Sequence, residues 1–128
     1  MSNKHDIYKP LILCVDDNEA VLDLTRMTLE RKGYRVLTAN GGRAALDAFA
    51  ACPIDAVILD YEMPGMNGAE VAQEMMRIKP NVPKLLFSGN VSISREETRI
   101  FQGYCSKPCG LFAIDSQINA MTAYARTA

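Results

Sequence analysis

The chain has 128 residues, of which 48% are hydrophobic and 23% charged, and its 14 Lys and Arg nearly balance its 15 Asp and Glu for a formal net charge of -1. This composition describes one globular domain, and the balanced charge disfavours direct binding to nucleic acid or to an anionic membrane surface. The apolar runs are far shorter than the ~18 residues of a membrane span, and no signal peptide is recognisable, so we expect a cytoplasmic protein.

Short apolar runs alternate with amphipathic stretches from about residue 10 onward, which predicts an α/β domain. The predicted strands span residues 11–15, 35–39, 56–59, 84–87 and 103–106. Most of these runs are almost entirely apolar. Strands of this kind belong in a parallel sheet that helices cover on both faces.

Helices are predicted in the intervals between the strands. They run from Asn18 to Gly33 and over about residues 42–51, 68–78, 93–101 and 109–125. Asn18 is a suitable N-cap, and Gly33 suits the position just past a helix C-terminus. We expect Val21, Leu24 and Thr28 to share one face of the first helix.

Polar residues collect where the predicted strands end. Asp16 and Asp17 follow the first strand, Asp60 the third, Ser88 the fourth and Lys107 the fifth. Open parallel sheets bind their ligands at this edge. Two carboxylates ~4 Å apart would repel each other by on the order of 4 kcal/mol, so we expect a divalent cation such as Mg²⁺ between them. A carboxylate held by a metal and a lysine can attack phosphorus and form an aspartyl phosphate, to which a serine hydroxyl can donate a hydrogen bond.

Four segments carry these residues, namely Leu13–Asn18 (LCVDDN), Ile58–Gly68 (ILDYEMPGMNG), Phe87–Gly89 (FSG) and Ser106–Pro108 (SKP). In this order and at this spacing they resemble the receiver domains of two-component response regulators, over about residues 10–125. The resemblance implies a flavodoxin-like, doubly wound sheet of five parallel strands in the order 2-1-3-4-5. The interval from Ser88 to Lys107 is about three residues shorter than in the family, which predicts a fourth helix shortened by about one turn.

The resemblance implies a role for each residue of the predicted metal and phosphoryl site. Asp60 matches the phosphoacceptor and metal ligand, and Asp17 a direct ligand of Mg²⁺. Asp16 matches an acid that acts on the metal partly through water. The backbone carbonyl of Glu62 matches a further ligand.

Four more positions match residues that respond to the phosphoryl group. Ser88 matches the hydroxyl residue that moves toward it, and Lys107 the lysine that contacts it. Tyr104 matches the switch aromatic. The bond between Lys107 and Pro108 is expected to be cis, as it often is in the family.

We therefore predict a signalling switch rather than a conventional enzyme, whose chemistry is limited to its own phosphorylation and autodephosphorylation. A receiver domain over residues 10–126 follows a polar tail of residues 1–9, and no output domain is expected. The domain would take a phosphoryl group from a sensor histidine kinase or a phosphotransfer protein onto Asp60. It would signal through altered binding to an unidentified downstream protein, as a monomer or weak homodimer.

Several alternatives stay open at this point. The chain could be a phosphorylation-independent scaffold, or a receiver fragment of a larger hybrid kinase or regulator. A haloacid-dehalogenase-type phosphohydrolase would need a second Asp where this chain has Glu62, and a flavin or nucleotide binder would need a phosphate-cradling loop where it has Asp16 and Asp17. The cysteine spacing does not suggest zinc. Cys109 is expected to have the most reactive thiol, with plain packing as the other reading.

Overall fold

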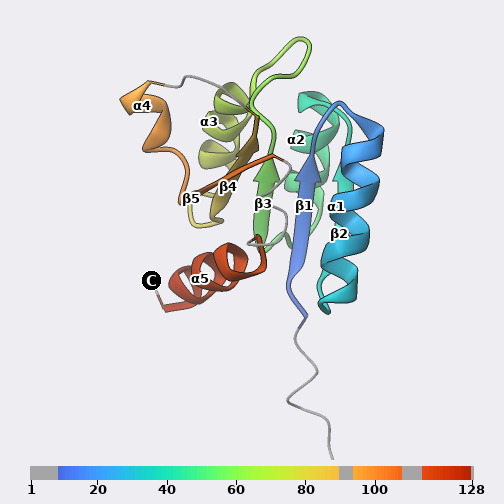
Figure 1. The fold of residues 1–128 in the computed structure, drawn as a ribbon. Helices are drawn as coiled ribbons and strands as arrows, with labels where there is room; N and C mark the ends of the chain where they lie inside the picture. Colours follow the sequence, from blue (N-terminus) through green and yellow to red (C-terminus); the bar gives the residue numbers. More distant parts are fainter. Residues whose placement is uncertain (1–8, 90–93, 108–113, 128) are drawn as a thin grey trace, which may run out of the picture.

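The computed structural model describes residues 9–89, 94–107 and 114–127, and it confirms the predicted doubly wound fold (Figure 1). The strands are β1 (Leu11–Val15), β2 (Arg35–Ala39), β3 (Ala56–Leu59), β4 (Lys84–Ser88) and β5 (Gly103–Ser106). They form one parallel sheet in the order β2-β1-β3-β4-β5. Because all the strands run the same way, their carboxyl ends lie along one edge.

The helices are α1 (Glu19–Arg31), α2 (Gly42–Ala51), α3 (Gly68–Ile78), α4 (Arg95–Thr98) and α5 (Ile114–Thr127). Alternate residues of β1 point to opposite faces of the sheet, and each face has its own apolar cluster. Ile12 packs on one face with Leu22 of α1 and Ile118 of α5. Leu13 packs on the other face with residues of α2 and α3.

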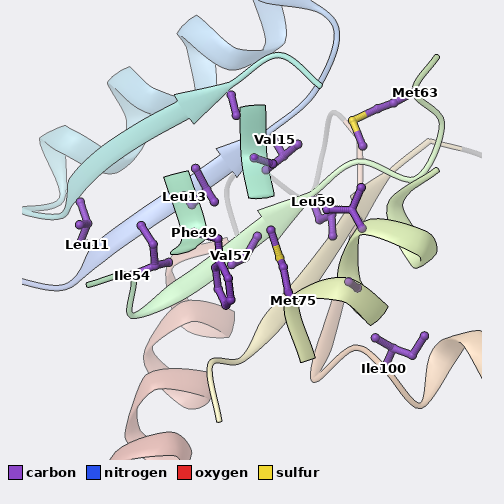
Figure 2. Packing of buried hydrophobic residues seen from close by; sticks show 14 residues of the cluster. Leu11, Leu13, Val15, Phe49, Ile54, Val57, Leu59, Met63, Met75 and Ile100 are labelled. Carbon is purple, nitrogen blue, oxygen red and sulfur yellow. The ribbon is translucent and has the colours of Figure 1, made fainter. Parts of the chain in front are cut away.

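The cluster beneath α2 and α3 is the larger of the two (Figure 2). Phe49 of α2 and Met75 of α3 lie against Val57 of β3, and none of the three exposes any surface to solvent. Full burial of a Phe or Met side chain contributes roughly 1.5–3 kcal/mol. These contacts fix α3, and with it the loop that joins β3 to α3.

The face that α1 presents to the sheet differs from the predicted one. Leu24, expected beside Val21 and Thr28, is 53% exposed, and the buried stripe contains Leu22 and Leu29 instead. The two stripes lie only about 100° apart around the helix. The observed rotation removes two leucines from water, whereas the predicted one would have buried a single leucine.

α4 is shorter than the predicted helix over residues 93–101, of which residue 93 lies outside the described part. The backbone N–H of Ile100 donates to the carbonyl of Glu97, three residues back, at 3.1 Å. Bonds of this spacing tighten the last turn and end the helix. Ile100 then turns into the apolar cluster, where it is only 7% exposed.

Some predictions fall outside the described residues. These are the polar tail up to residue 8, the cis bond expected at Pro108, and the reactive thiol expected at Cys109, where the last helix was predicted to begin. In the described part of that helix, Ile114 and Ile118 are fully buried. None of the described helices is long and apolar enough to cross a membrane.

A lysine lies buried at the amino end of β4, far from the predicted site. Lys84 is 1% exposed, and its Nζ donates to the carbonyl of Val82 at 2.8 Å. Within the described residues it forms no ion pair with a carboxylate. Burial lowers the pKa of Lys84 from its ordinary value. Burying the Lys84 ammonium ion therefore lowers the stability of the folded chain.

Replacing this lysine should stabilise the protein. We expect Lys84→Met to raise the free energy of unfolding by about 1 kcal/mol at neutral pH. The substitution removes a buried charge, and this gain exceeds the loss of one hydrogen bond. The unfolded chain binds the proton of Lys84 more tightly than the folded chain does, so the unfavourable contribution of Lys84 to wild-type stability shrinks as pH rises toward 10.5. The advantage of Lys84→Met should therefore shrink as pH rises.

Urea unfolding followed by circular dichroism at pH 7, 9 and 10.5 measures both effects, because the window of the change ends at the ordinary pKa of lysine. Lys32→Met, at an exposed position, serves as the control and should change stability by less than about 0.5 kcal/mol at every pH. A gain for Lys84→Met that is the same at all three pH values would contradict the assigned burial cost.

Candidate functional site

An open cleft of about 720 Å³ lies at the carboxyl edge of the sheet. It is lined by Asp16, Asp17, Asp60, Glu62, Ser88 and Lys107, among others. Backbone hydrogen bonds hold the strand ends in line, since Asp60 N donates to Val15 O and Lys107 N to Ser88 O, each at 2.9 Å. Four strands, β1, β3, β4 and β5, thus supply the residues that the sequence placed at this edge.

Three carboxylates converge in the cleft. Oxygen atoms of Asp16, Asp17 and Asp60 lie within 4.8 Å of one another. Asp16 and Asp60 are only 4% and 6% exposed, whereas Asp17 is open to solvent. Burial, and next the charge of Asp16, raise the pKa of Asp60, against the opposing effect of Lys107. The cluster favours any cation that can reach it.

Lys107 lies between two of these carboxylates. Its Nζ is 2.5 Å from Asp16 Oδ2 and 3.1 Å from Asp60 Oδ1. Burial acts to lower the pKa of Lys107, but the hydrogen bonds and charges of Asp16 and Asp60 outweigh it, so the pKa is raised. The side chain therefore stays an ammonium ion. No sequence pattern predicts that Lys107 Nζ lies closer to Asp16 than to Asp60.

The start of α1 orients Asp16. The second carboxylate oxygen, Oδ1, accepts from the backbone N–H of Asn18 at 2.9 Å. The side chain of Asn18 in turn accepts from the N–H groups of Ala20 and Val21 and so caps α1, as predicted. Helix capping and the placement of an acid in the cleft are thus two results of one local arrangement.

A glycine at the start of α3 allows the Asp60 loop to fold tightly. The N–H of Gly68 donates to the carbonyl of Tyr61 at 2.7 Å. A Cβ atom at Gly68 would lie 2.3 Å from the carbonyl oxygen of Asp60, closer than such atoms can approach. In the sequence, Gly68 marks only the start of the helix predicted over residues 68–78. The close approach is a tertiary contact that no local pattern announces.

The remaining predicted residues lie around the cleft. Ser88 ends β4 and is 1% exposed, and Glu62 lies at the rim with its side chain exposed. Tyr104 is 49% exposed, and its hydroxyl donates to the carbonyl of Gly89 at 3.4 Å. It therefore lies against the residue that follows Ser88.

Sequence reasoning assigned nothing to Tyr61. Its hydroxyl donates to both carboxylate oxygens of Glu97, at 3.2 and 3.1 Å. The contact joins the residue after Asp60 to α4, across 36 positions of sequence. A tyrosine beside a predicted site and an acid on a short helix show no periodic relation, so only the folded chain brings them together.

A doubly wound parallel sheet whose carboxyl edge gathers carboxylates, a serine and a lysine defines the class: a flavodoxin-like α/β domain with an acidic cleft. Asp16 and Asp17 follow β1, at the turn where phosphate-binding proteins of this fold class have a glycine-rich loop. The chain belongs to the response regulator receiver domain family, whose profile matches residues 12–119.

Similar proteins include whole regulators and sensor kinases. Response regulator MprA of Mycolicibacterium vanbaalenii is 36% identical over 118 residues, covering 90% of this chain and 50% of that protein. The autoinducer 1 sensor kinase/phosphatase LuxN of Vibrio campbellii is 32% identical over 124 residues, covering 88% of this chain and 14% of that protein. The chain thus spans half or less of the length of these relatives.

A similar solved structure is that of the response regulator TrrA from Thermotoga maritima, in complex with Mg²⁺ and BeF. It is 30% identical, with a TM-score of 0.82, and the match covers 88% of this chain and 98% of that one. Receiver domains are signalling switches, and this chain has their fold.

Proposed function

We propose that this domain accepts a phosphoryl group on Asp60, with Mg²⁺ bound beside it, and passes the signal on through altered protein binding. The observation that supports this most directly is the position of Lys107 between Asp16 and Asp60. A buried carboxylate that carries a fixed ammonium ion on one side can take on further negative charge.

The donor set fits a magnesium ion. Carboxylate oxygens are the ligands that Mg²⁺ prefers, and three of them lie within reach of one another. Asp17 and Asp60 would bind the ion directly, Asp16 would act on it partly through water, and the backbone carbonyl of Glu62 would complete the protein's share. When bound, the ion would supply positive charge for the phosphoryl oxygens.

The chain's own residues would carry the rest of the transfer. An oxygen of Asp60 attacks the phosphorus of a phosphohistidine; the new O–P bond forms as the P–N bond breaks, and its electron pair stays on the imidazole. Lys107 turns from the carboxylates to an oxygen of the phosphoryl group. Ser88, at the end of β4, donates a hydrogen bond to another. Autodephosphorylation would follow by attack of water on the same phosphorus, which breaks the O–P bond to Asp60, restores its carboxylate and releases inorganic phosphate.

The partner that supplies the phosphoryl group would be a sensor histidine kinase or a phosphotransfer protein, and the partner that reads it a downstream protein. Phosphorylation adds about -1.5 to -2 charge at neutral pH, which biases a surface between two arrangements. Tyr104, which lies against Gly89, is the proposed aromatic of that switch.

Intact mass after incubation with acetyl phosphate and Mg²⁺ tests the proposal. We expect one phosphoryl adduct per chain, and none when EDTA removes the metal. No adduct, together with no response to Mg²⁺ and beryllofluoride, would instead favour a phosphorylation-independent scaffold.

Removing the exposed acid of the cleft should weaken metal binding specifically. We expect Asp17→Asn to lower the affinity for Mg²⁺ on the order of tenfold, because one carboxylate ligand becomes neutral. Isothermal titration calorimetry with MgCl₂ measures the affinity. Asp23→Asn removes another exposed acid, on α1, that pairs only with Arg26 among the described residues, and it should leave the affinity unchanged. Equal losses in both variants would mean that general surface charge attracts the ion.

A further inference from the structure

Lys107 reaches its two carboxylates across the end of a neighbouring strand. It follows β5, whereas Asp60 follows β3 and Asp16 follows β1, and β4 lies between β5 and β3 in the sheet (Figure 1). Neighbouring strands lie about 4.8 Å apart. The lysine side chain therefore crosses β4 before its Nζ comes to 3.1 Å from Asp60 Oδ1.

An aromatic ring of β4 lies beneath this path. Lys107 Nζ is over the ring of Phe87, 5.8 Å from its centroid, which is within the range of about 6 Å at which a ring face attracts an ammonium ion. Phe87 packs on the same face of the sheet as its register partner Cys105, and Lys107 comes two residues after Cys105. Gly89, two residues after Phe87, has no side chain, and a Cβ added there would have no atom within 4 Å. The space over the ring is thus open to the lysine.

The ring of Phe87 is fixed by the core. Phe87 is only 4% exposed and belongs to the apolar cluster that contains Leu22 of α1 and Ile114 of α5. The side chain of Lys107 is 20% exposed and has a long flexible stem. A packed ring face thus restrains a flexible cation at the cleft.

The ring is also a partner of Lys107 that a metal ion cannot take. In the proposed function, Mg²⁺ binds the carboxylates of the cleft, which reduces the negative charge that holds the ammonium ion, and the two cations repel each other. An aromatic face attracts a cation, but it offers no oxygen ligand to a hard ion such as Mg²⁺. The contact with Phe87 should therefore matter most when the metal is bound and no phosphoryl group has arrived.

We propose that Phe87 is a positioning residue of the phosphoryl site, whose ring holds the ammonium ion of Lys107 beside Asp60 while Mg²⁺ occupies the carboxylates. This inference rests on the proposed function. Phe87 acts only through Lys107. A lysine that has left the cleft must return before it can contact a phosphoryl oxygen, so a weaker ring contact lowers the fraction of molecules ready to bind one.

Fluorination of the ring tests the contact while nearly keeping the size of the side chain. A trifluorinated phenylalanine in place of Phe87 withdraws the negative charge of the ring face that attracts the ammonium ion. The full chain is titrated with beryllofluoride, a phosphoryl mimic, in the presence of Mg²⁺, and the amide signal of Ser88 is followed by NMR. We expect the half-saturating concentration to rise about threefold, the size of a moderate cation–π interaction. A monofluorinated ring should give a smaller rise.

Phe49 provides the matched control. It is fully buried on the other face of the sheet (Figure 2), and Lys79 Nζ lies over its ring, 5.5 Å from the centroid. Neither residue lines the cleft. The same fluorinated ring in place of Phe49 weakens the same kind of contact and should keep the wild-type half-saturation. An equal rise in both proteins would mean that altered packing raises the value, and it would overturn the proposal.

Stability measurements without Mg²⁺ test the pair independently of phosphorylation. The unfolding equilibrium constant is measured in urea for the trifluorinated ring at position 87, for Lys107→Met and for both changes together. Fluorination should raise this constant about threefold more when Lys107 is present than in Lys107→Met. The corresponding cycle of Phe49 with Lys79→Met should show similar coupling and serves as the positive control.

Two results would overturn the role of Phe87. One is a cycle in which Phe87 and Lys107 show no coupling, and the other is a half-saturation that fluorination of Phe87 leaves unchanged or lowers. A wild-type chain that does not respond to beryllofluoride would instead overturn the proposed function, and with it the role of the ring.

Discussion

Asp60→Asn is expected to abolish the phosphoryl adduct completely. The amide keeps the size of the carboxylate but cannot attack phosphorus to give an acyl phosphate. Asp16, the other acid paired with Lys107, is already fixed by the N–H of Asn18. Intact mass after incubation with acetyl phosphate and Mg²⁺ should show a single unmodified species.

The control for this experiment is an acid elsewhere on the surface. Asp47 is exposed on α2, and Asp47→Asn should be phosphorylated like the wild type. An adduct that persists in Asp60→Asn would place the acceptor on another side chain. Peptide mapping after borohydride reduction of the acyl phosphate would then identify that residue.

Gly68→Ala should strongly destabilise the fold. Its Cβ would meet the backbone of the neighbouring Asp60–Tyr61 segment, at 2.3 Å from Asp60 O and 2.9 Å from Tyr61 Cα, and backbone cannot move aside as a flexible side chain can. We expect a loss of about 3 kcal/mol in the free energy of unfolding, the upper range for overpacked sites. Urea denaturation followed by circular dichroism measures the loss.

Gly41→Ala provides the comparison, because a Cβ at Gly41 has no atom within 4 Å. Gly41 is the N-cap of α2, where alanine is a poor cap, so a loss of up to about 1 kcal/mol is expected there. If the two variants lost the same stability, the helix start and not the contact with Asp60 would explain the glycine. Phosphorylation of the Gly68→Ala protein that remains folded should also slow, since the clash falls on the acceptor residue itself.

The strands and the place of the cleft could be predicted because each depends on short-range signals, whereas the order of the strands was implied only by the resemblance to receiver domains. Apolar runs give the strands, and parallel strands carry whatever follows them to one edge. The face of α1 was wrong because Leu24 and Leu22 are both apolar, and only the packing of the whole helix on the sheet selects between them. The end of α4 depends on Ile100 finding a place in the apolar cluster, which is also a tertiary effect.

Within the site, residue types could be predicted but their pairings could not. The positions of Asp16, Asp60 and Lys107 at the ends of predicted strands single them out, yet no sequence pattern predicts that the lysine lies closer to Asp16 than to Asp60. No sequence pattern predicted the contact between Tyr61 and Glu97, since neither residue belongs to a motif that points to the other. Contacts between segments that share no periodicity are the part of a site that sequence patterns leave open.

The cleft takes its residues from four strands, and Lys107 meets Asp16 across 91 positions of sequence. In a chain still emerging from the ribosome, or in one whose β5 has detached from the sheet, the carboxylates of the cleft are present but Lys107 is not beside them. The proposed phosphorylation would therefore be limited to molecules in which β5 has joined the sheet. Mg²⁺ at 100 times its dissociation constant would stabilise those molecules by about 2.7 kcal/mol, so the supply of the ion would also govern how many survive proteolysis.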